Sequence, residues 1–338
     1  MTTSDKIPDR VIAKILEYSQ FGAVLILRQV NRKFRNFIDD PENLECLPDS
    51  KLYGIDLIAR ENSIELSVYS PEDSLTATYH KQENEKTSRT TGAHTVVIEN
   101  SEFLNLVMID LEKVLKFQKS SMNYFVIGMN FNPEHLEENS ISKTLPIKLK
   151  ALLESRKPEY IKTERLQISA FHEEQVMAIL PFLDPEHLKR IHIAFNTVFL
   201  VHLEMSEIVE TQQWKNAEFL YMRPQEFSAD LKHLEHFLWS KVCFQSLSAE
   251  DLDFMKKMYC NSPKFEEFDA YTKKFDSIEK LNYIWGPPIL QKNESHWYFK
   301  CSNSEEVMKI RCIFGEISFI ILSRIKKDDV PPDVVVRE

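Results

Sequence analysis

The chain has 338 residues and a formal net charge of −10, and this acidity makes nucleic acid a poor default partner. Hydrophobic residues make up 43% of the chain and charged residues 28%, which is the balance of an ordinary globular protein with a large core. The six glycines are too far apart to form a phosphate-binding loop of the Walker or dinucleotide type. The composition therefore argues against the common nucleotide-dependent enzymes.

The five cysteines contain no C-x-x-C pair, which favours reduced thiols and a cytoplasmic or nuclear location. Metal-ligand pairs at zinc-site spacing are absent from the sequence, and no other cofactor is indicated. The N-terminal sequence lacks the cationic start and apolar core of a signal peptide. No uncharged apolar run approaches the length of about 18 residues that a membrane span needs. We therefore expect no metal, no cofactor and no membrane contact.

Residues 7–38 carry three helical signals. Pro8 stands at the start of the first helix, where its missing N–H costs nothing, and apolar residues then recur at helical spacing through Leu16. A turn around Gly22 precedes a second helix, and a third apolar stripe ends before Pro41. The pattern predicts a unit of three short helices.

This helical unit carries more apolar residues than so small a structure can bury. A surplus apolar face usually contacts a partner or the adjoining domain. Residues 7–38 also contain six lysines and arginines against only Asp9 and Glu17, a local charge of +4 in an acidic chain. Both features indicate docking on an acidic protein partner.

The same residues resemble an F-box. The family pattern is an apolar–proline start, an Ile-Leu pair and then Leu-x-x-Arg-x-Val-(Cys/Ser/Asn)-(Arg/Lys). In this chain these places are held by Ile7-Pro8, Ile15-Leu16, Leu25, Arg28, Val30, Asn31 and Arg32. The turn at 19–23 departs from the usual Leu-Asp/Ser-Pro. The resemblance implies binding to the Skp adaptor of a Skp–cullin–F-box ubiquitin ligase through Pro8, Ile12, Ile15, Leu16, Leu27 and Val30. The alternative is an ordinary helical bundle within a larger domain.

The next region is expected to be rich in β-structure. Residues 41–48 are expected to form a linker, and alternating apolar residues predict a hairpin over 51–70 and strands at 76–80 and 96–98. The polar run 81–92 predicts an exposed loop. Helical periodicity predicts a helix over 103–117.

From residue 124 onward a short strand followed by a helix recurs. Apolar strand anchors at 166, 191, 219, 242 and 268 are separated by 25, 28, 23 and 26 residues. A unit of this length is typical of a leucine-rich-repeat solenoid, here an irregular variant because the asparagine ladder is absent. Residues 296–300, 307–313 and 317–322 predict three antiparallel strands as a C-terminal cap.

Two further segments, DLEKVLKFQKS and ERLQISAFHEEQVMAILPFLDPEHLKRIHI, resemble the FTH (FOG homology) domain that follows the F-box in expanded nematode families. The resemblance implies a partner-recruiting domain and brings no catalytic residues with it. The expected α+β organisation is an F-box over 5–45, a β-rich segment over 50–100, an FTH-type strand–helix repeat over 101–325 and a loose tail over 326–338.

Candidate target-binding residues follow from strand alternation. If the pairs 166/168, 191/193, 219/221 and 268/270 face inward, the outward residues are Arg165, Gln167, His192, Glu218, Glu267 and Asp269. In a solenoid such residues line the recognition surface, and the alternative is that they are merely solvated. Adjacent acidic pairs such as Glu173-Glu174 are poorly arranged for acid–base catalysis, and His233 and His236 lack a third metal ligand.

Three hypotheses for the function follow. The first is a non-catalytic ubiquitin-ligase subunit that binds the Skp adaptor, through it a cullin, and an unidentified target protein, while other chains supply the catalysis. The second is a non-degradative scaffold that uses the Skp contact as a tether. The third is an enzyme, which predicts a deep pocket with convergent polar groups.

Overall fold

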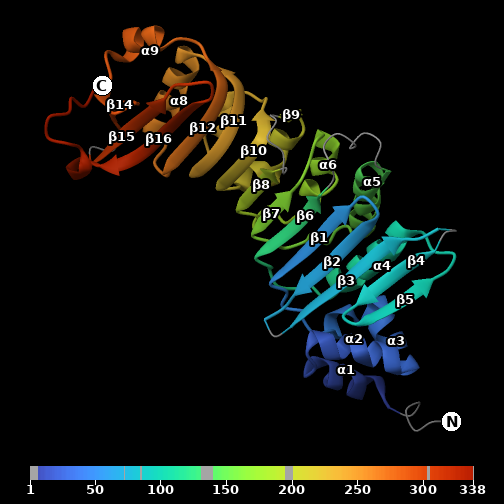
Figure 1. Cartoon of the computed structure of the whole chain (residues 1–338). Helices are drawn as coiled ribbons and strands as arrows, with labels where there is room; N and C mark the ends of the chain where they lie inside the picture. Colours follow the sequence, from blue (N-terminus) through green and yellow to red (C-terminus); the bar gives the residue numbers. More distant parts are fainter. Residues whose placement is uncertain are drawn as a thin grey trace. The chain divides into compact units, whose positions relative to one another are not determined.

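The computed structural model describes residues 7–71, 73–83, 86–130, 140–194, 201–302 and 305–337 (Figure 1). They form two compact units. The first unit comprises Met1–Glu164 and Phe182–His187, and the second comprises Arg165–Pro181 and Leu188–Glu338. The chain is a mixed α+β protein, with helices at the N-terminus and mostly β-structure in the rest.

The first unit begins with three helices, as predicted: α1 (Asp9–Glu17), α2 (Phe21–Val30) and α3 (Arg32–Asp39). The Asn31 side chain caps α3 by accepting the backbone N–H groups of Lys33 and Phe34 at 2.8 and 3.3 Å. One side of each helix faces a shared core, whose buried members are Ile12, Leu16, Phe21, Val24, Phe34, Phe37 and Ile38. Apolar residues at helical spacing thus build this three-helix module.

The segment after α3 is part of the fold, which corrects the expected linker. Residues Pro41–Cys46 form a 3-10 helix, η2. Lys116 donates from Nζ to the carbonyl oxygens of Ile38 and Asp39 at 2.9 and 3.0 Å, because the last carbonyls of a helix need external donors. The ring of Phe21 packs against Phe117 with 5.3 Å between centroids, so the three-helix module shares a core with the chain around residue 117.

The described remainder of the first unit contains six strands and two α-helices. The strands are β1 (Gly54–Arg60), β2 (Ser63–Tyr69), β3 (Ser74–Lys81), β4 (Thr87–Thr91), β5 (His94–Ile98) and β6 (Tyr124–Met129), and the helices are α4 (Phe103–Leu115) and α5 (Ser140–Ser155). Strands β1 to β5 form an antiparallel meander, and β6 pairs with β1 in parallel. The Tyr79 hydroxyl on β3 donates to Asp110 on α4 at 2.5 Å and joins the two layers.

Strand β4 corrects the loop expected at 81–92. Thr87 and Ser88 are buried, and the Thr87 hydroxyl donates to the carbonyl oxygen of Ser101 at 3.1 Å. Backbone pairing with β3 and β5 and β-branched threonines make this strand without any large apolar residue. Residues 84–85, in the same predicted loop, lie outside the described residues.

Five parallel strands lead the second unit: β7 (Arg165–Ile168), β8 (Arg190–Ala194), β10 (Phe219–Phe227), β11 (Trp239–Leu247) and β12 (Glu267–Phe275). Each predicted strand anchor falls in one of them, so these strand predictions are confirmed. Helices α6 (Glu173–Met177), α7 (Gln212–Asn216) and α8 (Ala249–Asn261) and the 3-10 turns η5 (Ile208–Glu210) and η6 (Leu231–Leu234) connect them, and β9 (Val201–Leu203) pairs with β10.

Antiparallel strands complete the second unit. The order is β12, β16 (Ser318–Lys326), β15 (Glu306–Ile313), β14 (Glu294–Lys300) and β13 (Ile289–Gln291), with α9 (Ile278–Trp285) before them. The three predicted C-terminal strands are therefore confirmed. Arg337, in the segment expected to be a loose tail, exchanges backbone hydrogen bonds with Tyr298 and Lys300 at 2.9 and 2.8 Å, which anchors the segment to β14 at this point.

No helix in the described part of the chain is long and apolar enough to cross a bilayer.

Candidate functional site

The outer side of the three-helix module is apolar and exposed. Val11 and Ile15 on α1 and Tyr18 at its C-cap are exposed and recur at spacings of four and three residues, so they share one side of the helix. On α2, Ile26 is 62% exposed and Val30 is 74% exposed, again four residues apart. We call these five side chains the docking face. The module thus exposes several large apolar side chains in addition to those that form its core.

The residues predicted to contact an adaptor divide into two groups. Pro8, Ile15 and Val30 are exposed and Leu27 is half-buried, whereas Ile12 and Leu16 are completely buried between the helices. We therefore assign Ile12 and Leu16 to the core of the module, where they hold its shape and have no surface for a partner to touch. The sequence pattern could not separate adjacent residues of α1, because 11, 12, 15 and 16 are all apolar.

The first turn of α3, which follows the end of α2, lies beside the N-terminal end of α1. Lys33, in the first turn of α3, donates from Nζ to the carbonyl oxygen of Ile7 and lies 3.8 Å from a carboxylate oxygen of Asp9. Because Lys33 follows Val30 by three residues, this contact brings Val30 and Pro8 to the same end of the module. Val11, Tyr18 and Ile26 complete the docking face and were missed among the predicted contacts, although helical spacing from Ile15 and Val30 identifies them.

Many of the cationic side chains of the module form ion pairs or hydrogen bonds within the module itself. Arg28 makes a two-bond contact with Asp39 at 2.7 and 2.9 Å, and Lys14 pairs with Glu17 at 2.9 Å. The Arg35 guanidinium donates to the carbonyl oxygens at the end of α2. Within the described ranges, Arg10 and Arg32 have no ion pair. The cationic excess available to a partner is therefore smaller than the sequence count.

In the second unit, one side of the sheet presents two rows of side chains in register, which we call the outer strand face. The first row crosses β7, β8, β10, β11 and β12 as Arg165, Arg190, Phe219, Trp239 and Glu267. The second row runs parallel to it as Gln167, His192, Tyr221, Lys241 and Asp269. The structure thus brings five of the six predicted target-binding residues onto one surface.

Glu218 is the exception, because the predicted alternation of β10 is wrong by one residue. Leu220 and Met222 are completely buried and pair with Ile191 and Ile193, whereas Phe219 and Tyr221 are half-exposed on the outer strand face. All four residues of the run Phe-Leu-Tyr-Met are apolar, so alternation alone could not choose between the two faces. Glu218 precedes the strand and pairs with Lys189 at 3.3 Å.

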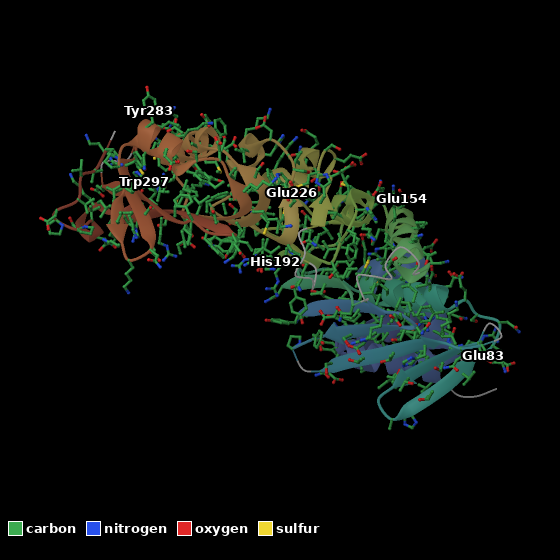
Figure 2. The ribbon with its side chains drawn as sticks, turned by 45° about the horizontal axis from the view of Figure 1, so that its top comes forward. Glu83, Glu154, His192, Glu226, Tyr283 and Trp297 are labelled. Carbon is green, nitrogen blue, oxygen red and sulfur yellow. The ribbon has the colours of Figure 1, made fainter. Side chains whose placement is uncertain are left out.

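The β7–β8 end of the outer strand face is electropositive. The guanidinium of Arg190 lies over the ring of Phe219 at 4.7 Å, and the rings of His192 and Tyr221 are 5.5 Å apart. Burial, with the positive charges of Arg165 and Arg190, lowers the pKa of His192 to about 4. His192 is therefore a neutral side chain near pH 7. In Figure 2 the labelled His192 and Tyr283 lie on opposite sides of the second unit, so this face lies away from α9.

The acidic side chains at the β12 end of the same face are held by local contacts. Lys241 pairs with Asp269 at 3.1 Å, and the Trp239 indole N–H donates to Glu267 at 3.1 Å. Arg223 lies over the ring of Tyr271 at 3.9 Å. The outer strand face is thus polarised, with its acidic side chains engaged at one end and arginines concentrated at the other.

A cleft of about 710 Å³ in the first unit lies between the α1–α2 turn and the β2–β3 turn, with Glu17, Cys46, Asp49 and Asp73 among its lining residues. The Asp49 carboxylate already accepts hydrogen bonds from the backbone N–H groups of Lys51 and Lys119 at 3.2 and 3.0 Å. Across the described residues, no group of three His, Cys, Asp or Glu side chains could hold a metal ion.

Two domain families match this chain. The F-box domain matches residues 5–46, over the three-helix module and η2, and the FTH domain matches residues 143–284. The chain is also similar to F-box A protein 224 of Caenorhabditis elegans, with 23% identity over 267 residues, which cover 75% of this chain and 62% of that relative. No solved structure matches. An F-box followed by an FTH domain matches the architecture of the nematode F-box proteins that carry both domains.

Proposed function

We propose that this chain is the substrate-recruiting subunit of a Skp–cullin–F-box ubiquitin ligase. The docking face would bind the Skp adaptor, and the outer strand face would bind the target protein. The observation that carries the proposal is the exposed docking face, with Ile26 and Val30 largely open to solvent on a module matched by the F-box domain. Exposed apolar groups of this kind on a small module favour a partner surface.

The adaptor contact would use Pro8, Ile15, Leu27 and Val30 directly, with the rest of the docking face around them. Ile12 and Leu16 would act indirectly by packing α1 against the other two helices. Arg10 and Arg32 supply the charge that remains for an acidic adaptor, in keeping with complementary charges at protein interfaces. The protein itself would then be a receptor without a catalytic role.

The proposed organisation is an F-box over 5–45, a β-rich segment over 50–100, an FTH-type repeat over 101–325 and a terminal segment over 326–338. We infer that the parallel strands of the second unit form an irregular solenoid of the leucine-rich-repeat kind. Five successive parallel strands with helical returns support this reading, as does the spacing of 23 to 28 residues between strand anchors. The outer strand face would then be its recognition surface.

The attachment of the F-box to the sheet of the first unit supports a ligase role. A receptor of this kind works by holding a target close to the transfer machinery, and such proximity depends on fixed geometry. The contacts of Lys116 with the end of α3 and of Phe117 with Phe21 fix the docking face relative to the sheet of the first unit. A flexible linker would not give this constraint.

The test is co-expression of the full chain with the Skp adaptor. We expect the two proteins to co-purify as a stable complex, and a wild-type chain that is folded but does not bind the adaptor would refute the proposal. Degradation is tested separately, by measuring the half-life of captured targets with the wild-type chain and with Val30→Asp. Targets that are stabilised by the variant support the ligase role, whereas unchanged half-lives favour a scaffold that uses the adaptor only as a tether.

A further inference from the structure

Two cysteines of the second unit lie against each other. Cys260 stands on the last turn of α8 and is 8% exposed, and Cys301 follows the end of β14 and is 9% exposed. Ser302 joins the two segments by donating from its backbone N–H and from Oγ to the carbonyl oxygen of Cys260, at 3.3 and 3.2 Å. The Cys260 thiol donates a hydrogen bond to the sulfur of Cys301. The two sulfur atoms are therefore in contact, although they come from distant parts of the chain.

The surroundings of Cys301 favour its thiolate. Its sulfur accepts hydrogen bonds from the Cys260 thiol and from the backbone N–H of Met308 on β15. The hydrogen bond from Cys260 and the positive charge of Arg324 lower the pKa of the Cys301 thiol, although burial and Glu306 oppose them. A thiolate is the reactive form of cysteine, so Cys301 is the nucleophile of the pair.

The positive charge beside the two thiols is fixed in place. The Arg324 guanidinium donates to the carbonyl oxygens of Tyr259, at 3.0 Å, and of Ser262, on either side of Cys260 in the chain. It also pairs with Glu306 at 2.9 Å, and its side chain is only 6% exposed. A guanidinium held by these contacts remains beside the sulfur atoms, where it stabilises negative charge on either of them.

The other three cysteines have different surroundings. Cys312 is completely buried and Cys243 is 5% exposed, and burial raises the pKa of both thiols. Such thiols are poor nucleophiles near pH 7. Cys46 is exposed, and it lies in the first unit. These three residues therefore serve as internal references for the reactivity of Cys260 and Cys301.

We propose that Cys260 and Cys301 are a peroxide-responsive thiol pair, which a hydroperoxide oxidises to a disulfide that ties the end of α8 to the end of β14. Cellular disulfides outside the secretory pathway are mostly transient and formed by such pairs. The inference goes beyond the proposed function and does not depend on it, because the residues of the pair lie in the second unit and the docking face lies in the first.

The reaction with hydrogen peroxide has two steps. The Cys301 thiolate attacks one peroxide oxygen, the O–O bond breaks and hydroxide leaves, so that Cys301 becomes a sulfenic acid. The Cys260 sulfur then attacks the sulfenic sulfur, and the S–H proton leaves with the hydroxyl group as water. The first hydroxide takes up the proton that the Cys301 thiol had released. Two thiols and one peroxide thus give one disulfide and two waters, with two electrons passing from sulfur to oxygen.

The disulfide should make the second unit more resistant to unfolding. It would close a loop from residue 260 to residue 301, which restricts the unfolded chain, and the contact of the two sulfur atoms means that little native structure has to move. We expect the oxidised chain to unfold at a temperature about 5 °C or more above that of the reduced chain. Dithiothreitol should reverse this shift.

The experiment treats the reduced full chain with hydrogen peroxide, blocks the remaining thiols with N-ethylmaleimide and analyses a tryptic digest without reduction. Trypsin places the five cysteines in separate peptides, of which 258–264 and 301–309 carry Cys260 and Cys301. We expect these two peptides to be joined and the other three cysteines to carry the blocking group. The same treatment in concentrated urea is the control, because the unfolded chain has no reason to favour this pair.

Two variants assign the roles of the pair. In Cys260→Ser, which keeps a hydrogen-bond donor beside Cys301, the sulfenic acid should persist, and dimedone should label peptide 301–309 at least about ten-fold more than in the wild type. In Cys301→Ser, neither the disulfide nor a label on Cys260 should form. Cys243→Ser is the matched control, because it removes another buried thiol of the second unit and should leave the yield of the disulfide unchanged.

The decisive result comes from the wild-type chain, so it stands even if a variant folds poorly. Folded protein that resists oxidation, that links its cysteines as randomly as in urea, or that joins two chains through Cys46 overturns the inference. Oxidation of Cys312 as fast as that of Cys301 overturns it as well. A disulfide between Cys260 and Cys301 that leaves the unfolding temperature unchanged refutes the tie between α8 and β14.

Discussion

Replacing Val30 with aspartate should weaken adaptor binding by at least about ten-fold without unfolding the chain. Val30 is 74% exposed on the last turn of α2, so the substitution leaves no cavity and should change the free energy of unfolding by less than about 0.5 kcal/mol. Complete burial of a valine side chain contributes about 1.5–3 kcal/mol. The three-quarters of that surface still open to a partner corresponds to about 1–2 kcal/mol, or about 5- to 30-fold in affinity.

Aspartate adds a second penalty, because a carboxylate buried against an apolar partner without a counter-ion costs further free energy. We therefore expect the dissociation constant for the Skp adaptor to rise by at least about ten-fold, measured by titration calorimetry of the full chain. Val97→Asp is the matched control, since Val97 is 56% exposed on β5 and lies outside the docking face. It should leave the adaptor affinity unchanged.

Leu16→Ala distinguishes the core of the module from its surface. Leu16 is completely buried, so this change should lower the free energy of unfolding by about 2–5 kcal/mol, visible in a thermal scan. Any loss of adaptor binding in this variant would follow from unfolding. The reasoning is refuted if Val30→Asp remains folded and binds the adaptor with wild-type affinity, because the exposed end of α2 would then lie outside the contact.

Three further changes test the interior. The buried Glu173 carboxylate accepts the backbone N–H groups of Glu207 and Ile208 at 2.7 and 3.1 Å, so Glu173→Ala should lower the free energy of urea unfolding by about 2–3 kcal/mol, whereas exposed Glu174→Ala should not. The pKa of His192 is lowered from 6.5 to about 4, so between these pH values the unfolded chain binds a proton that the folded chain does not. The free energy of unfolding should therefore fall as the pH drops from about 6.5 to about 4. In His192→Gln the free energy of unfolding should fall less over the same range. Lys116→Met removes the donor at the end of α3 and should cost about 1–2 kcal/mol in calorimetry and speed amide exchange there; an unchanged exchange rate would contradict this anchoring role.

The sequence located the parallel strands of the second unit well, because each combines buried apolar residues with a similar spacing of 23 to 28 residues to the next. It could not choose the faces of β10, where four consecutive apolar residues fit either register. The choice is made by neighbours far away in sequence: Leu220 and Met222 complete rows begun by Leu166 and Ile168 on β7 and continued on β8. Such non-local pairing leaves no trace in a single strand.

Other features were beyond reach for different physical reasons. Strand β4 consists of three threonines, one serine and one arginine, so only its backbone pairing with β3 and β5 identifies it as a strand. The contact between Lys116 and α3 joins residues nearly 80 positions apart in sequence. In the candidate site, the charge pattern pointed to a partner, but the sequence did not show that Arg28 would be neutralised by Asp39.

The F-box of this chain is best regarded as one part of a larger folded unit. Phe21 on α2 shares an aromatic contact with Phe117, and the backbone N–H of Ser50 donates to the carbonyl oxygen of Phe117 at 2.8 Å. Lys119 extends this seam by donating from Nζ to the carbonyl oxygen of Glu45 at 2.9 Å. A chain cut near residue 40 would therefore expose the core of the remaining unit as well as lose the docking face. Point substitutions on that face separate attachment from folding, which truncation cannot do.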